Sequence, residues 1–181
     1  MARINIVDPK TASGETKELL DGVQQALGAT PNFIRVLANS PSALRAFLGL
    51  HQIASSGSLE APTRERIALA VAEQNACQYC VSAHTAIGRK AGLDSAEMLK
   101  NRLGQSADPK AEAALRLAKS LVEEVGDVSD GELEAARRAG LGDAEIVEII
   151  THITLNIFTN VLAKATRIDI DFPRVSLGAA A

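Results

Sequence analysis

The segment from Glu73 to His84 holds the residues best suited to chemistry. The chain's only two cysteines, Cys77 and Cys80, stand three positions apart in it, and His84 follows four positions after the second. Each helical residue is rotated about 100° from the one before it, so both thiols and the imidazole share one face of a helix. Cys80 and His84 are then close enough to touch. A thiol beside an imidazole can lose its proton, and the thiolate is its reactive form.

The two cysteines compete for the role of reactive thiolate. Cys77 lies nearer the start of the helix, where the positive end of the helix dipole stabilises a thiolate by about 0.3–1 kcal/mol. Cys80 lies beside His84, and contact with an ionisable partner should outweigh the dipole. The spacing therefore predicts Cys80 as the reactive thiol, with Cys77 within disulfide range.

Two glutamates could support the imidazole. A helical hairpin turning at residues 75–76 would bring Glu65 and His84 face to face at similar height. A carboxylate beside a histidine orients the ring and raises its basicity. Glu73 is closer in sequence but lies near the turn, level with Cys77, and could be the acid instead.

Other interpretations of these polar residues compete with catalysis. The Cys-x-x-Cys pair could be accidental, or it could bind structural zinc, which needs further ligands and usually a second knuckle. His51 is expected to be an ordinary side chain on a surface or half-buried helix. His152 forms a polar stripe with Glu148, Asn156 and Thr159, interpreted first as a subunit contact or solvated face and second as a pocket wall.

Helix signals dominate the elements that must position these residues. Capped amphipathic runs predict helices at 18–27, 42–56, 63–74, 77–91, 95–102, 109–125, 130–139 and 144–167. The helix at 63–74 is apolar on nearly every face and should be buried. Only 4–7 suggests a strand, 168–173 looks extended, and the tail 174–181 should be disordered. No linker divides the chain, so we expect one all-α domain over 1–181, a helical bundle with its redox core at 58–93.

A weak internal repeat lies 48 residues apart. Arg-Lys-Ala-Gly-Leu at 89–93 matches Arg-Arg-Ala-Gly-Leu at 137–141, and each is followed by Ala-Glu after a further two residues. A duplicated helix-turn-helix unit would explain the match, but so would a common helix end with a glycine cap. The second copy carries neither cysteine nor histidine at the corresponding positions.

Composition excludes several classes of protein. The net charge of −3 gives no reason to expect nucleic-acid binding. The N-terminal sequence lacks the apolar run of a signal peptide, and no stretch of about 18 uncharged apolar residues predicts a membrane span. We therefore expect a cytoplasmic protein. In that reducing compartment a cysteine pair is more often catalytic or metal-binding than structural.

The spacing of Glu65, Cys77, Cys80 and His84 resembles the signature of alkylhydroperoxidase D, the peroxidase branch of the carboxymuconolactone decarboxylase superfamily. The resemblance implies an all-helical fold and reduction of hydroperoxides. Cys80 would attack the peroxide, the more exposed Cys77 would resolve it and meet a dithiol reductant, and His84 with Glu65 would relay protons. It further implies a homo-oligomer, trimer or hexamer, without cofactor or metal, which in some members draws electrons from a lipoyl-bearing protein.

One residue departs from the family pattern. The best-known member has a histidine just before the second cysteine, where this chain has Tyr79, which cannot act as a base at neutral pH. Two further hypotheses therefore stand beside the thiol peroxidase: a thiol–disulfide redox module or sensor with little peroxide turnover, and a metal-binding or scaffold protein.

Overall fold

The computed structural model describes residues 2–178, which form nine α-helices and no strand. The predicted all-α class is confirmed, and the predicted helices begin and end close to the observed ones. Only the short second helix is unpredicted. In chain order the helices are α1 (Gly14–Leu27), α2 (Asn32–Leu37), α3 (Pro41–Ser55), α4 (Ala61–Gln74), α5 (Gln78–Lys90), α6 (Ser95–Arg102), α7 (Pro109–Glu123), α8 (Asp130–Arg138) and α9 (Asp143–Thr166).

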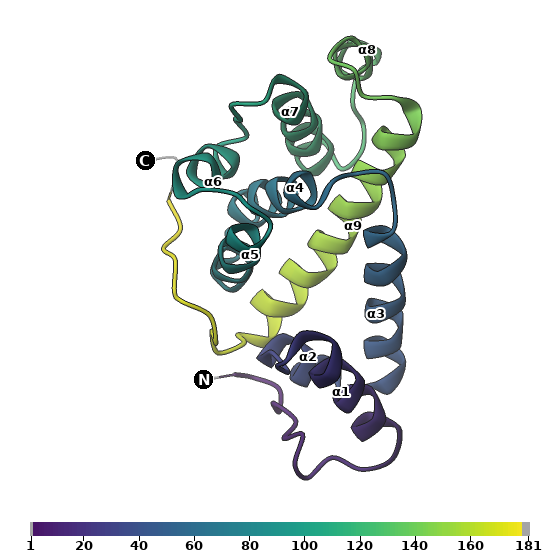
Figure 1. Ribbon diagram of the computed structural model, residues 1–181, viewed down its shortest axis with the longest axis vertical. Coiled ribbons are helices and arrows are strands. Elements are labelled where there is room, and N and C mark those ends of the chain that lie inside the picture. The colour runs from purple at the N-terminus through teal and green to yellow at the C-terminus, as the bar shows by residue number, and fades with distance from the viewer. Residues whose placement is uncertain (1, 179–181) are drawn as a thin grey trace.

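Helix α4 is the centre of the bundle, and its predicted burial is confirmed. It packs against α5, α6, α7 and α9, and its six consecutive residues 67–72 are all buried. Figure 1 shows α9 crossing the middle of the molecule, with α3 on one side of it and α4 and α5 on the other. Three of the residues 67–72 of α4 are alanine, and these small side chains let the neighbouring helices approach closely.

The turn between α4 and α5 fixes the hairpin that carries the redox segment. Ala76 takes a left-handed conformation with φ of 50°. The Ala76 N–H donates to the Glu73 carbonyl, and the Cys77 N–H donates to the Ala72 carbonyl. These two hydrogen bonds form a Schellman motif, which ends α4 and sends the chain directly into α5. The predicted hairpin at 75–76 is thus confirmed.

The repeated basic-Ala-Gly-Leu motif has the same conformation in both copies. Gly92 and Gly140 each have φ of 91°, and each begins the same pair of backbone hydrogen bonds back into its helix. Helices α4 and α6 end with these hydrogen bonds too, although their sequences differ. A shared way of ending helices therefore accounts for the motif without a duplication.

The two terminal segments differ from what their sequences suggested. Residues 4–7 form no strand; instead the Val7 N–H donates to the Arg35 carbonyl, and the Arg35 side chain donates to the Val7 carbonyl. The tail was expected to be disordered over 174–181, and this is wrong for 174–178. The Val175 N–H donates to Ser82, and the Arg102 guanidinium donates to the Ser176 carbonyl. Residues 179–181 lie outside the described residues.

Helix α9 is long and apolar enough to span a membrane, by length and composition alone. A core helix of a soluble protein has the same properties. Within the molecule, the polar residues that interrupt α9, His152, Asn156 and Asn160, are buried and hydrogen-bonded to neighbouring groups. The arrangement is compatible with a soluble helical protein.

Candidate functional site

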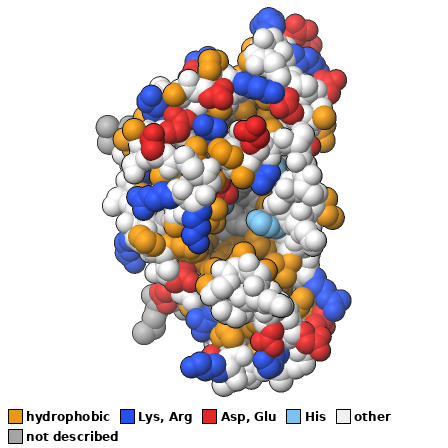
Figure 2. Space-filling model, viewed as in Figure 1, with side chains coloured by type: hydrophobic (Ala, Val, Ile, Leu, Met, Phe, Trp, Pro, Cys, Tyr) orange, Lys and Arg blue, Asp and Glu red, His pale blue; other side chains and the backbone are white. Residues whose placement is uncertain are grey.

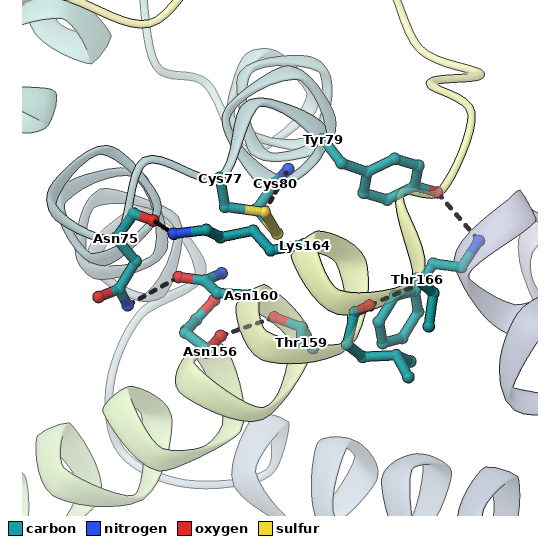
Figure 3. The surroundings of a disulfide bond; sticks show 11 residues. Asn75, Cys77, Tyr79, Cys80, Asn156, Thr159, Asn160, Lys164 and Thr166 are labelled. Carbon is teal, nitrogen blue, oxygen red and sulfur yellow. Dashed lines mark hydrogen bonds between the residues drawn. A yellow bond between two sulfur atoms is a disulfide. The ribbon is translucent and has the colours of Figure 1, made fainter. Parts of the chain in front are cut away.

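A disulfide joins Cys77 to Cys80 at the start of α5 (Figure 3). Their Cα atoms lie 5.3 Å apart. Cys77 is the N-cap of α5, with an extended backbone, and its Sγ accepts a hydrogen bond from the Cys80 N–H. The two sulfurs are therefore within bonding range, as the spacing predicted, although Cys77 sits just before the helix and not on its face.

Both cysteines are buried within the single chain. The exposed fraction is 1% for Cys77 and 3% for Cys80. The expectation that Cys77 is the more exposed of the pair is therefore wrong here. The cause is the packing of α9 and the segment after it against the start of α5, which no local sequence pattern reveals. A pocket of about 280 Å³ nevertheless borders Cys77, with Tyr79, Lys164 and Arg167 among its lining residues.

Glu65 and His84 meet across the α4–α5 hairpin. The His84 Nδ1 lies 2.8 Å from the Glu65 Oε2. The side chains are only 20% and 16% exposed, respectively, so water screens the pair only in part. The predicted facing of these two residues is confirmed. With Nδ1 held by the carboxylate, Nε2 is the ring nitrogen left to exchange a proton with another group.

Glu73, the alternative acid, has a different partner. Its carboxylate accepts from the Arg102 guanidinium at 2.8 Å and from the backbone N–H of Gly178. Glu73 thereby holds α6 and the C-terminal tail against α4. The structure brings Glu65, and not Glu73, to His84.

Tyr79 ties distant segments together beside the disulfide. Its hydroxyl accepts from the Phe33 N–H at 3.1 Å and donates to the Asp171 carboxylate at 3.0 Å. Burial, together with the neighbouring Asp171 carboxylate, raises the pKa of Tyr79 well above its ordinary value. The phenol therefore stays protonated, and its role in the structure is to connect α2, α5 and the tail.

His51 lies in the electrostatic neighbourhood of the Glu65–His84 pair, which the sequence did not reveal. Desolvation lowers the pKa of His51, even though part of its side chain is exposed, and the Glu65 carboxylate opposes this shift. Arg64 and His84 lower the pKa further. Figure 2 shows a hollow near the middle of one face of the molecule, bordered by hydrophobic side chains and a histidine.

The polar stripe of α9 is buried at two of its four residues, His152 and Asn156. His152 is 4% exposed, and its Nε2 lies 3.2 Å from the Ala54 carbonyl oxygen. The amide of Asn156 donates to the His152 carbonyl, and Glu148 accepts the N–H groups of Ser58 and Leu59. Of the first interpretation, a solvated face is wrong for His152 and Asn156, which are buried within the chain, whereas Glu148 and Thr159 are partly exposed and the subunit contact stays a prediction. Glu148 and His152 line a pocket of about 230 Å³.

Potential metal ligands are scattered. Within residues 2–178, no group of three or more histidine, cysteine, aspartate and glutamate side chains is placed to hold a metal ion. The chemistry available at this site is that of the two sulfurs and the Glu65–His84 pair.

One family model matches part of the chain. The model of the carboxymuconolactone decarboxylase family matches residues 41–120, which include α4, the redox pair and the Glu65–His84 contact. No curated protein matches the chain in sequence.

Solved structures share the fold over nearly the whole chain. A peroxidase-related protein from Ralstonia eutropha JMP134, described as an alkylhydroperoxidase AhpD core, has a TM-score of 0.83 and 24% identity, covering 94% of this chain and 92% of its own. A peroxidase-related protein from Silicibacter sp. TM1040 has a TM-score of 0.81 and 23% identity, covering 93% and 91%. A cysteine-to-alanine variant of the debrominase Bmp8, in complex with 2,3,4-tribromopyrrole, has a TM-score of 0.78 and 19% identity, covering 94% of both chains.

These likenesses establish the fold. At identities below 25% they leave the reaction to be argued from the site, because one fold hosts many chemistries.

Proposed function

Taking as premise that residues 41–120 belong to the carboxymuconolactone decarboxylase family, we propose that this chain is a thiol-dependent peroxidase that reduces hydroperoxides through Cys80 and Cys77. Members of one fold can differ in reaction, so the proposal depends on the site itself. The observation that carries it is the Cys77–Cys80 disulfide on the same hairpin as a Glu65–His84 contact of 2.8 Å.

The proposed reaction begins with the reduced pair. His84 takes the proton of Cys80. The thiolate then attacks the terminal oxygen of the hydroperoxide and breaks its O–O bond. The alcohol leaves with the proton returned by His84, and Cys80 becomes a sulfenic acid. Cys77 then condenses with it, releasing water and closing the disulfide seen in the structure. A dithiol donor reopens the disulfide by exchange and is itself oxidised.

Glu65 is assigned the positioning role in this cycle. With Nδ1 of His84 held at 2.8 Å by the carboxylate, the ring is oriented, and the carboxylate faces the imidazolium that forms when the proton moves. Tyr79 is assigned no role in proton transfer, because its hydroxyl is buried between Phe33 and Asp171 and its pKa is raised.

The test is a peroxidase assay with hydrogen peroxide and an organic hydroperoxide, using several dithiol donors. We expect turnover that needs a dithiol, and mass spectrometry of the peroxide-treated protein should show loss of both thiols with no added mass. A stable sulfinic acid on Cys80 without a Cys77–Cys80 bridge would contradict the resolving role of Cys77. The brominated pyrrole bound by the Bmp8 variant is a useful comparison substrate in the same assay.

The second candidate is a thiol–disulfide redox module or sensor. The burial of both cysteines favours this second function, because Cys77 is 1% and Cys80 is 3% exposed. Burial limits the access of a bulky peroxide to Cys80. In that case the pair would oxidise and be reduced, but peroxide turnover with any dithiol would be negligible. Metal analysis of the purified protein addresses the third hypothesis, a metal-binding scaffold.

The proposal extends to a cytoplasmic homo-oligomer. Helix α9 buries one face in the core, but Val147, Phe158 and Val161 on its other face are 61%, 40% and 60% exposed. Exposed apolar side chains that gather on one helix are typical of a surface covered by another subunit. A trimer or hexamer is the assembly we propose.

A further inference from the structure

We propose that Asn160 is a catalytic residue of the step that closes the disulfide, in which its side-chain amide donates a hydrogen bond to the oxygen of the Cys80 sulfenic acid. This hydrogen bond stabilises the oxygen as it leaves and Cys77 takes its place on the sulfur. The inference rests on the proposed function, and it adds a donor from α9 to a site otherwise built from the α4–α5 hairpin.

The side-chain nitrogen of Asn160 is a buried donor without an acceptor. Asn160 is 1% exposed, and its Nδ2 forms no hydrogen bond within residues 2–178. A buried N–H group left unpaired lowers the stability of the fold, so proteins rarely keep one without a reason. A catalytic role that supplies the acceptor at one stage of a reaction cycle is such a reason.

The hairpin turn fixes the orientation of this amide. The Asn160 Oδ1 accepts from the Asn75 Nδ2 at 2.9 Å, so the Asn160 nitrogen faces the other way. Figure 3 shows the disulfide between the start of α5 and α9, with the Asn160 nitrogen turned away from Asn75 toward the side where the sulfurs lie. Asn75 is held in turn by its backbone carbonyl, which accepts from the Lys164 Nζ at 2.6 Å. The donor is therefore preorganised beside the redox pair.

The other polar side chains of α9 that Figure 3 labels around the disulfide already have acceptors. Each donates to a backbone carbonyl: Asn156 to His152, Thr159 to Asn156, Lys164 to Asn75 and Thr166 to Leu162. Among these labelled side chains of α9, Asn160 is the one with a donor left to give. Because α9 packs against α5, an oxygen on Cys80 is buried between the helices and needs such a donor.

The step is a displacement at the Cys80 sulfur. Reaction with the hydroperoxide leaves Cys80, which is 3% exposed, as a buried sulfenic acid. The Cys77 thiolate attacks this sulfur, so an S–S bond forms and the S–O bond breaks, with its electron pair going to the oxygen. The oxygen takes up the proton that Cys77 lost and leaves as water. The two-electron oxidation of Cys80 is then shared by both sulfurs as the disulfide.

The hydrogen bonds at the two sulfurs suit this division of roles. The Cys80 N–H donates to the Cys77 Sγ at 3.4 Å, and Cys77 is the N-cap of α5, so Cys77 is stabilised as the attacking thiolate. The Asn160 amide stabilises the negative charge that develops on the departing oxygen, as a fixed donor in a site shielded from water does best. A closed disulfide carries no oxygen, which accounts for the unpaired amide in this structure.

The experiment separates the two sulfur reactions in Asn160→Leu, which keeps the branched shape of the side chain and removes its donor. The reduced full chain is mixed with equimolar hydrogen peroxide, sulfenic acid is trapped with dimedone at timed points, and the disulfide is quantified by mass spectrometry. We expect disulfide closure to slow by roughly 10- to 100-fold, the effect of losing one hydrogen bond to a charged group. The first thiol should be lost at an unchanged rate, so sulfenic acid accumulates, and excess peroxide converts part of it to sulfinic acid.

Asn156→Leu is the matched control. Asn156 is a second buried asparagine of α9, 5% exposed and one helical turn earlier, but its amide already donates to the His152 carbonyl. Its substitution makes the same change in side-chain size and should leave the rate of disulfide closure unchanged. Melting curves show which variants fold, and the pair Asn160→Ala and Asn156→Ala repeats the comparison if leucine prevents folding.

The outcomes separate this assignment from the peroxidase proposal. Disulfide closure at the unaltered rate in Asn160→Leu, an equal slowing of both reactions without trapped sulfenic acid, or the same accumulation in Asn156→Leu would overturn the assignment even if turnover with a dithiol is normal. Accumulation of sulfenic acid in the Asn160 variants alone supports it even if no dithiol sustains turnover, and then only the peroxidase proposal fails. A reduced protein that peroxide does not oxidise would overturn both.

Discussion

Replacing Glu65 by glutamine tests the hairpin and the chemistry together. The substitution keeps the size of the side chain and a neutral acceptor oxygen, but it removes the charge that faces His84 at 2.8 Å. A hydrogen bond to a charged group is worth about 1.5–3 kcal/mol. If this bond is made in full only when the imidazole becomes protonated, its loss slows the peroxide step by roughly 10- to 150-fold.

That estimate reaches the lower end of the range of about 10²–10⁴-fold typical of general acid–base catalysis. The measurement is the single-turnover rate of Cys80 oxidation by peroxide in Glu65→Gln, followed by loss of thiols. Melting curves of the same protein separate slow chemistry from unfolding.

Glu73→Gln is the matched control for Glu65→Gln. Both residues belong to α4 and both lie in a partly buried ion pair, but Glu73 contacts Arg102 and the tail. Its substitution should lower stability, because it weakens the contacts with Arg102 and Gly178. The rate of the peroxide step should stay within about twofold of the unaltered rate, because separate sites without shared partners act nearly independently. If Glu73→Gln stops the reaction and Glu65→Gln does not, the assignment of Glu65 as the positioning carboxylate is wrong.

Three further predictions concern stability and assembly. Ala76→Gly should stabilise the fold by up to about 1 kcal/mol, because Ala76 has φ of 50°, which glycine adopts without strain. Ala91→Gly, at φ of −79°, is the control and should destabilise the fold. The midpoint of thermal unfolding of each variant measures the difference. Burial alone would raise the pKa of Glu97, but hydrogen bonds outweigh burial and hold the pKa at about 2. The stability that Glu97 contributes above pH 4.5 should therefore be lost as the pH falls toward 2. A free energy of unfolding that does not change over this pH range would contradict the assignment. Val161→Glu should dissociate the oligomer in light scattering, and Val125→Glu, on an exposed loop, should not.

The sequence predicted the elements around the site well because their signals are local. Pro62 and Gly92 bracket the hairpin, and the nearly continuous apolar run of α4 marks it as buried. The facing of Glu65 and His84 followed from counting residues on either side of one turn. The short helix α2 was missed because six residues carry too little periodicity to stand out from a loop.

The properties that depend on contacts distant in sequence could not be predicted. The Tyr79 hydroxyl finds its partners 46 and 92 positions away, and no pattern near Tyr79 points to either. The burial of Cys77 results from the end of α9, and that of His152 from its contact with Ala54, 98 positions away. Local periodicity describes a helix face but not what will cover it.

The position of Tyr79 gives the protein an intrinsic optical reporter. The chain has no tryptophan and a single tyrosine, which stands between the two cysteines in sequence and adjoins the pocket next to Cys77. A disulfide quenches the emission of a nearby aromatic ring, whereas a pair of thiols does so far less. Tyrosine fluorescence of the unlabelled protein should therefore brighten on reduction and dim on oxidation, so that each half of the thiol cycle can be timed without a dye.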